Sequence, residues 1–104
     1  RRLYGERPDL RLCASPLQAL EGAGMLDSTM IIVSADHGGH NHSHNAGLAC
    51  DRDIAWIARG PRVRHNYAIK GRISTMDTAA TALSALGLQP MTRIVGQPVT
   101  EIFQ

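Results

Sequence analysis

The stretch that decides the fold is Thr29-Met30-Ile31-Ile32-Val33-Ser34-Ala35-Asp36-His37-Gly38-Gly39. Its first half is apolar and β-branched, which predicts a buried strand over 29–34. The apolar run ends abruptly in a carboxylate, an imidazole and two glycines, and glycine lets the backbone turn and approach a ligand closely. Because α/β sheets bind ligands beyond the carboxyl ends of their strands, the pattern predicts a functional site at the end of this strand.

The segments on either side predict alternating helices and strands. Ser15-Pro16 is typical of a helix start, and a second short apolar strand is expected over 54–58. Apolar residues at helical spacing predict a helix over 76–86, with Gly87 as its stop. Strand and helix in alternation indicate an α/β fold.

Composition limits the function classes. A chain of 104 residues forms at most one small domain, and 43% hydrophobic residues suits a globular protein. The formal charge of +2 is too balanced to indicate specific binding of nucleic acid. No run approaches the roughly 20 apolar residues that a membrane-spanning helix needs. The two cysteines lack Cys-x-x-Cys spacing and indicate neither a disulfide scaffold nor a thiolate zinc site.

Asp36 and His37 are candidate metal ligands, since carboxylate oxygen and imidazole nitrogen suit zinc-like or manganese-like ions. Neighbours on a regular strand point to opposite faces, so the two can converge on one ion only where the strand ends and turns. The following loop over 38–52 is rich in Gly, His and Asn, and we expect it to be functional. Cys50 and Asp51 receive no role from the sequence.

A different interpretation needs no enzyme. His40, His42 and His44 alternate along the loop and could chelate a transition metal, as other His-rich tracts do. The chain would then be a noncatalytic His-rich metal-binding module. This hypothesis leaves Asp36-His37 after a strand unexplained.

Several ordered blocks carry a family resemblance: Ala35-Asp36-His37-Gly38-Gly39-His40 followed by His44, then residues 53–61, 77–88 and 96–99. Together they resemble the C-terminal part of the alkaline phosphatase superfamily, nearest to its type I phosphodiesterase/nucleotide pyrophosphatase and sulfatase-like branches. The resemblance implies an α/β fold, as the C-terminal part of a three-layer α/β/α domain. It also implies two divalent metal ions, zinc or alternatively manganese. Asp36 and His37 would bind one ion and His44 the other, with His40 in contact with a ligand residue or the substrate.

The implied function is that of a metal-dependent hydrolase acting on phosphate esters, phosphodiesters or sulfate esters. In the resembling family a Ser or Thr well upstream attacks the ester, and no such nucleophile site is found in this chain. Residues 1–104 are therefore expected to be the C-terminal segment of a single hydrolase domain whose nucleophile-bearing N-terminal part is absent. Such a segment should be inactive alone and should pack against the remainder of its own domain or another copy of itself. A phosphomutase of the same superfamily is the alternative.

Overall fold

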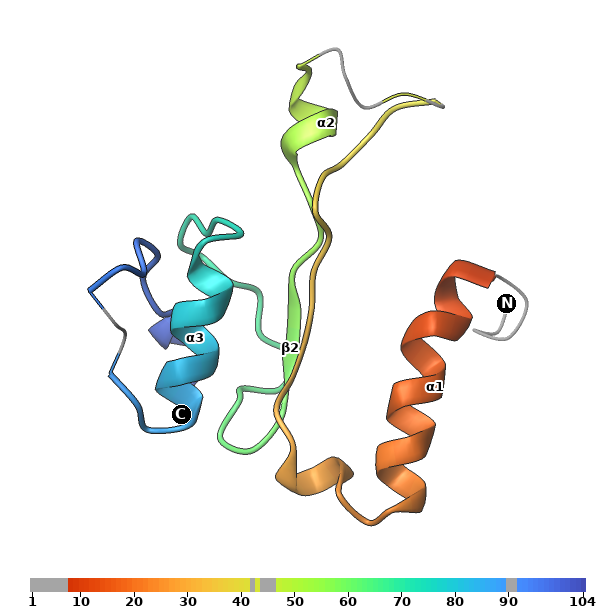
Figure 1. Ribbon diagram of the computed structural model, residues 1–104, viewed down its shortest axis with the longest axis vertical. Helices are drawn as coiled ribbons and strands as arrows, with labels where there is room; N and C mark the ends of the chain where they lie inside the picture. Colours follow the sequence, from red (N-terminus) through yellow and green to blue (C-terminus); the bar gives the residue numbers. More distant parts are fainter. Residues whose placement is uncertain (1–7, 42, 44–46, 90–91) are drawn as a thin grey trace.

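The computed structural model describes residues 8–41, 43, 47–89 and 92–104 (Figure 1). In chain order the elements are α1 (Pro8–Gly22), the 3-10 helix η2 (Leu26–Ser28), β1 (Ile31–Val33), α2 (Ala49–Arg52), β2 (Ile57–Arg59), α3 (Asp77–Ala85) and the 3-10 helix η3 (Thr100–Ile102). The hairpin arm formed by β1, β2 and the chain beyond them runs through the middle of the molecule, with α2 near its far end. In the view of Figure 1, α1 and α3 lie on opposite sides of this arm.

The strands β1 and β2 form an antiparallel pair in which Ile32 lies opposite Ala58 and Val33 opposite Ile57. Helices combined with this two-stranded sheet are consistent with the predicted α/β class. The strands are shorter than expected, and they are not fully buried, since Val33 is 37% and Ile57 61% exposed. The run 29–34 was expected to be a buried strand, but β1 is only partly covered, because no described helix packs closely against Val33.

The first helix begins earlier than the sequence predicted. It starts at Pro8, and Pro16 lies inside it rather than at its first position. Proline fits the first turn of a helix because its missing N–H would be unpaired there, and Pro8 satisfies this rule as well as Pro16 does. The helix interior tolerates Pro16 at the cost of one backbone hydrogen bond. Pro8 and Pro16 are both typical of a helix start, and the prediction placed the start at the second of them.

The last helix agrees with the prediction. The helix α3 lies within the expected range 76–86, and Gly87 follows with a φ of +73°, a left-handed conformation that ends helices at low cost. Asp77 begins it, as expected for an acid in the first helical turn. The Asp77 carboxylate accepts hydrogen bonds from the N–H of Ser74 at 2.8 Å and from the N–H of Gln97 at 2.9 Å.

A buried hydroxyl completes the attachment of α3 to the C-terminal segment. Thr81 is fully buried, and its Oγ1 donates to the Asp77 carbonyl at 2.7 Å and accepts from the Val99 N–H at 2.9 Å. Val99 belongs to the small apolar core, with Val63 and Ile102. The partly buried side chains around that core are Met30, Trp56, Ala58, Ile69, Ile73 and Phe103. The core therefore joins β1 and β2 to the C-terminal segment.

Large apolar side chains stay exposed on both strands, at several helix caps and in the segment after α3. The residues concerned are Met25, Val33, Leu48, Ile57, Met76, Leu86, Leu88 and Val95. The chain exposes 8382 Å², whereas a compact monomer of 11.3 kDa exposes about 5,700 Å². Its radius of gyration is 15.5 Å, against about 13 Å for a compact chain of this length. None of the described helices has the length and apolar character needed to cross a membrane.

Glu101 ties the segment 67–71 to the C-terminal segment. Its carboxylate accepts hydrogen bonds from the Gly71 N–H at 2.7 Å, the Lys70 N–H at 3.1 Å and the Tyr67 hydroxyl at 2.8 Å. These bonds, with that from Gly71 the strongest and those from Lys70 and Tyr67 next, hold the pKa of Glu101 below its ordinary value. The same bond to Glu101 raises the pKa of Tyr67 above its ordinary value.

The first prediction concerns this carboxylate. A lowered pKa means that Glu101 stabilises the fold in its charged form, so its contribution is present at neutral pH and lost as pH falls through that lowered pKa. We expect Glu101→Gln to lower the thermal unfolding midpoint by a few degrees at about pH 7, with the difference shrinking below about pH 4. Thermal scans across that pH range measure it. The matched control is Glu21→Gln on the exposed part of α1, and an equal effect of both substitutions would contradict the assignment.

Candidate active site and metal centre

Beyond the strands, the hairpin arm is continued by backbone pairing. The Gly38 N–H donates to the Asp51 carbonyl at 2.8 Å, and the Gly39 N–H donates to the Cys50 carbonyl at 2.7 Å. A side chain at position 38 would clash with this arrangement, since a Cβ there would lie 2.5 Å from the Asp53 carbonyl oxygen and closer still to that of Cys50. Gly38 is therefore required by close approach of two backbone segments, which refines the predicted role of this glycine in the turn.

Asp36 and His37 lie between the end of β1 and this paired region, as the sequence predicted. The two residues face solvent, with side chains 88% and 46% exposed, and His37 Nε2 lies 3.6 Å from Asp36 Oδ2. Two ligand atoms on one tetrahedral ion with bonds of about 2.1 Å are about 3.4 Å apart. The separation of the two side chains is therefore compatible with binding to a shared ion.

Short contacts orient both side chains. Asp36 Oδ1 accepts the His37 backbone N–H at 2.9 Å, and His37 Nδ1 lies 2.6 Å from the Gly38 carbonyl. A carbonyl can only accept, so this second contact requires a proton on Nδ1, and in the neutral ring the lone pair is then on Nε2. That is the tautomer in which Nε2 can bind a metal ion.

The predicted ligand of the second ion, His44, lies outside the described residues, and so does His42. The assignment of His44 stays a prediction. His40 is described, and the turn after it has a left-handed Asn41 and closes with the pairing of His40 to Ser43. Among the hydrogen bonds of the described residues, the His40 ring contacts Asp51 and neither of the two predicted ligands, Asp36 and His37.

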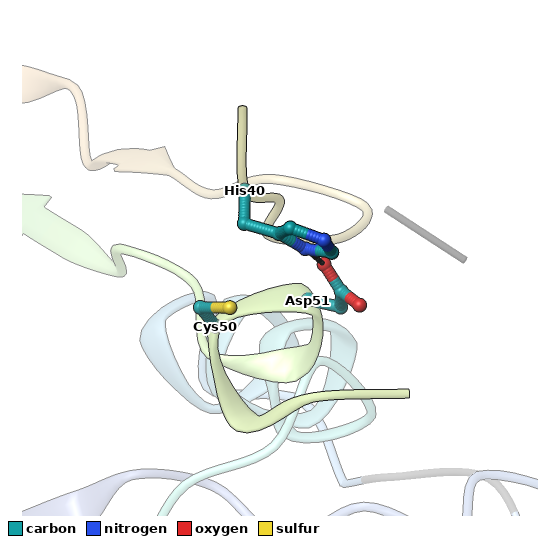
Figure 2. Close-up of side chains that lie close together, drawn as sticks. All are labelled: His40, Cys50 and Asp51. Carbon is teal, nitrogen blue, oxygen red and sulfur yellow. Dashed lines mark hydrogen bonds and ion pairs between the residues drawn. The ribbon is translucent and has the colours of Figure 1, made fainter. Parts of the chain in front are cut away.

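The structure brings together three residues that the sequence did not connect: His40, Cys50 and Asp51 (Figure 2). Asp51 is 4% exposed, and its Oδ1 lies 2.7 Å from His40 Nδ1. Its Oδ2 accepts the Leu48 N–H at 3.2 Å, which caps the start of the short helix α2. The predicted loop 38–52 thus contains one helical turn, which is too short for any periodic pattern to reveal. An acid three residues after the cap position was the available signal for this turn.

The second prediction concerns Gly38. We expect Gly38→Ala to destabilise the arm by about 1–3 kcal/mol, because the added methyl group must displace two backbone carbonyls. Hydrogen exchange at the Gly38 and Gly39 amides should quicken, and thermal unfolding should shift to lower temperature. The control is Gly22→Ala at the end of α1, where a Cβ meets no atom within 4 Å. Unchanged exchange in Gly38→Ala would contradict the observed pairing.

Comparison with known proteins found similarity to sulfatases. The chain is 33% identical over 96 residues to an arylsulfatase of Chlamydomonas reinhardtii, covering 83% of this chain and 15% of the relative. It is 36% identical over 78 residues to an arylsulfatase of Volvox carteri, covering 65% of this chain and 12% of the relative. No family model and no solved structure gives a significant match.

These matches agree in part with the resemblance of the sequence to the alkaline phosphatase superfamily, since both relatives are arylsulfatases. The chain spans about one seventh or less of the length of the two arylsulfatases. The similarity favours the sulfatase-like branch over the phosphodiesterase branch, which stays a prediction. The comparisons thus support a relationship of this chain to the sulfatases within the alkaline phosphatase superfamily.

Proposed function

We propose that this chain is the metal-binding, C-terminal segment of a sulfatase-like hydrolase that cleaves sulfate esters. The observation that carries the proposal is the Asp36-His37 pair, which follows strand β1 in a segment similar to arylsulfatases. Because of this similarity, we rank sulfate esters as candidate substrates above the phosphate esters and phosphodiesters that the sequence also predicted. Both substrate types present a tetrahedral anionic group, so the same ligand chemistry suits either.

The donor set of the pair fits a divalent ion. Asp36 offers a carboxylate oxygen and His37 an imidazole Nε2, and the contact of Nδ1 with the Gly38 carbonyl fixes the tautomer that a ligand needs. A bound ion would neutralise charge on the transferring sulfuryl or phosphoryl oxygens. Zinc or manganese suits this mixed set, and His44 would hold a second ion.

The surface of the chain supports its being part of a larger domain. A groove of about 550 Å³ runs between β1 and α3, with Ile32, Ala85, Leu86 and Phe103 in its lining. A second groove separates α1 from β1, where Leu17 and Leu20 face the strand. Exposed apolar area on this scale costs free energy in water, so we propose that further layers of the same domain cover it. Those layers would supply the nucleophile.

The third prediction tests the ligand assignment in the complete enzyme. Asp36→Ala and His37→Ala should each lower the rate of sulfate-ester hydrolysis by more than about 100-fold, because losing even a residue that supports a ligand costs about 10–100-fold. His42→Ala and the exposed His65→Ala should leave the rate unchanged. Nitrophenyl sulfate, nitrophenyl phosphate and a phosphodiester, assayed in parallel, identify the preferred ester.

Each alternative has its own outcome in that experiment. Absence of ester hydrolysis in the wild-type protein, together with metal binding that depends on His40, His42 and His44 and not on Asp36 and His37, would indicate a noncatalytic His-rich binding module. Transfer of the phosphoryl group within a sugar phosphate, without its release to water, would indicate a phosphomutase. Hydrolysis of phosphodiesters ahead of sulfates would favour the phosphodiesterase branch.

The fourth prediction concerns residues 1–104 as an isolated chain. Because it contains no nucleophile site and exposes many apolar side chains, it should show no ester hydrolysis and should self-associate. Light scattering across a concentration series measures the association, and Ile57→Lys, on the exposed side of the hairpin, should weaken it. Hydrolysis by a monomeric isolated chain would overturn the proposal that this is a segment.

A further inference from the structure

We propose that His40, Cys50 and Asp51 form a separate binding site for a zinc-type transition metal on the hairpin arm. This inference does not depend on the proposed hydrolase activity. The three ligand atoms, one from each residue, all lie within 4.8 Å of one another. Figure 2 shows the imidazole of His40 above the Asp51 carboxylate, with Cys50 alongside.

Backbone pairing makes this site. The bonds from Gly38 and Gly39 to the carbonyls of Asp51 and Cys50 hold the two ends of the loop together, so that residues ten and eleven positions apart in the sequence become neighbours. The one-turn helix α2 then presents Cys50 and Asp51 beside His40. Two of the three side chains are thus positioned before any ion binds, which lowers the entropy cost of binding.

The burial of Asp51 favours a cation. Its side chain is 2% exposed, and among the described residues its carboxylate receives two hydrogen bonds, from His40 and from the Leu48 N–H. The ion pairs of the described residues include no lysine or arginine at this carboxylate. Its ion-pair partner among the described residues is His40, which is charged only when protonated, so a divalent ion would supply a permanent positive charge to this buried carboxylate.

The metal replaces the proton that His40 and Asp51 share. Their Nδ1 and Oδ1 atoms are 2.7 Å apart, a hydrogen-bond distance, whereas two ligands of one tetrahedral ion lie about 3.3 Å apart. Binding through Nδ1 therefore opens this pair by about 0.6 Å; the Nδ1 proton leaves to solvent and Nε2 carries the ring proton, so the ligating imidazole stays neutral. Cys50 is exposed and forms no disulfide, and its Sγ lies within 4.8 Å of the other two ligand atoms. Its thiol proton also leaves to solvent when the ion binds.

The ligand set selects the metal. Thiolate, imidazole and carboxylate together suit zinc and cobalt, whereas magnesium and calcium prefer oxygen ligands alone. The three protein ligands leave a fourth tetrahedral position for water or another group. The sulfur ligand also distinguishes this site experimentally from the Asp36-His37 pair, which offers only oxygen and nitrogen ligands.

Cobalt(II) is the probe that tests the site, because thiolate ligation gives a near-ultraviolet charge-transfer band that oxygen and nitrogen ligands lack. Titrating the purified protein with cobalt should produce this band, and zinc should abolish it. Cys50→Ser should eliminate the band, whereas the matched control Cys13→Ser should retain it. Asp51→Asn and His40→Ala should weaken cobalt affinity by about 10-fold or more. Asp36→Ala and His37→Ala should leave the band in place.

A second measurement uses the wild-type protein, so that its result does not depend on correct folding of the loop in a variant. Alkylation of Cys50 by iodoacetamide, followed by mass spectrometry, should slow at least about 10-fold on adding zinc to the wild-type protein and remain unslowed in Asp51→Asn. A band that survives Cys50→Ser, or zinc that leaves the alkylation of Cys50 unchanged, would overturn the site. Loss of the band in Asp36→Ala or His37→Ala would show that Cys50 shares an ion with the predicted pair, which would contradict a separate site.

Discussion

The arrangement of this chain depends on one backbone contact, the pairing of Gly38 and Gly39 with the carbonyls of Asp51 and Cys50. It extends the β1–β2 hairpin beyond its last strand residues and closes the loop that carries the candidate ligands. The contact is possible only because position 38 has no Cβ. Without this pairing, the chain after β1 would be free to fray at Asp36 and His37. The two ends of the loop would also no longer be held side by side, so His40 would not be kept near Cys50 and Asp51.

The rest of the fold holds this arm in place through a small apolar core and a few side chains that each form several hydrogen bonds. Among the residues that the structure describes, the buried apolar cluster is small and consists of Val63, Val99 and Ile102. Polar side chains that form several hydrogen bonds add to the stability of this small core. Thr81 links α3 to Val99, and the Glu101 carboxylate accepts three hydrogen bonds from the segment 67–71. Such contacts are specific, and they fix the register of the C-terminal segment where hydrophobic burial alone would leave it loose.

The exposed apolar surface is explained by the proposed larger domain, which would also complete the proposed metal site. The grooves and the exposed side chain of Val33 lie along β1, the strand that leads to Asp36, and the exposed Ile57 lies opposite Val33 on β2. Layers that cover this strand would also approach the ligand pair, and further ligands and a nucleophile could then come from the same layers. The similarity to arylsulfatases several times longer than this chain agrees with that explanation.

The sequence by itself determined the local features of the protein. The strand before Asp36-His37 and the helix that ends at Gly87 are short-range consequences of residue type, and both were predicted. The start of α1 was mispredicted because two Pro signals compete locally, and no local rule ranks them. The adjacency of His40, Cys50 and Asp51 could not be predicted, since it depends on which backbone segments pair across a loop. Only the tertiary structure decides that pairing, because the energy of each contact depends on the position of a partner ten or more residues away.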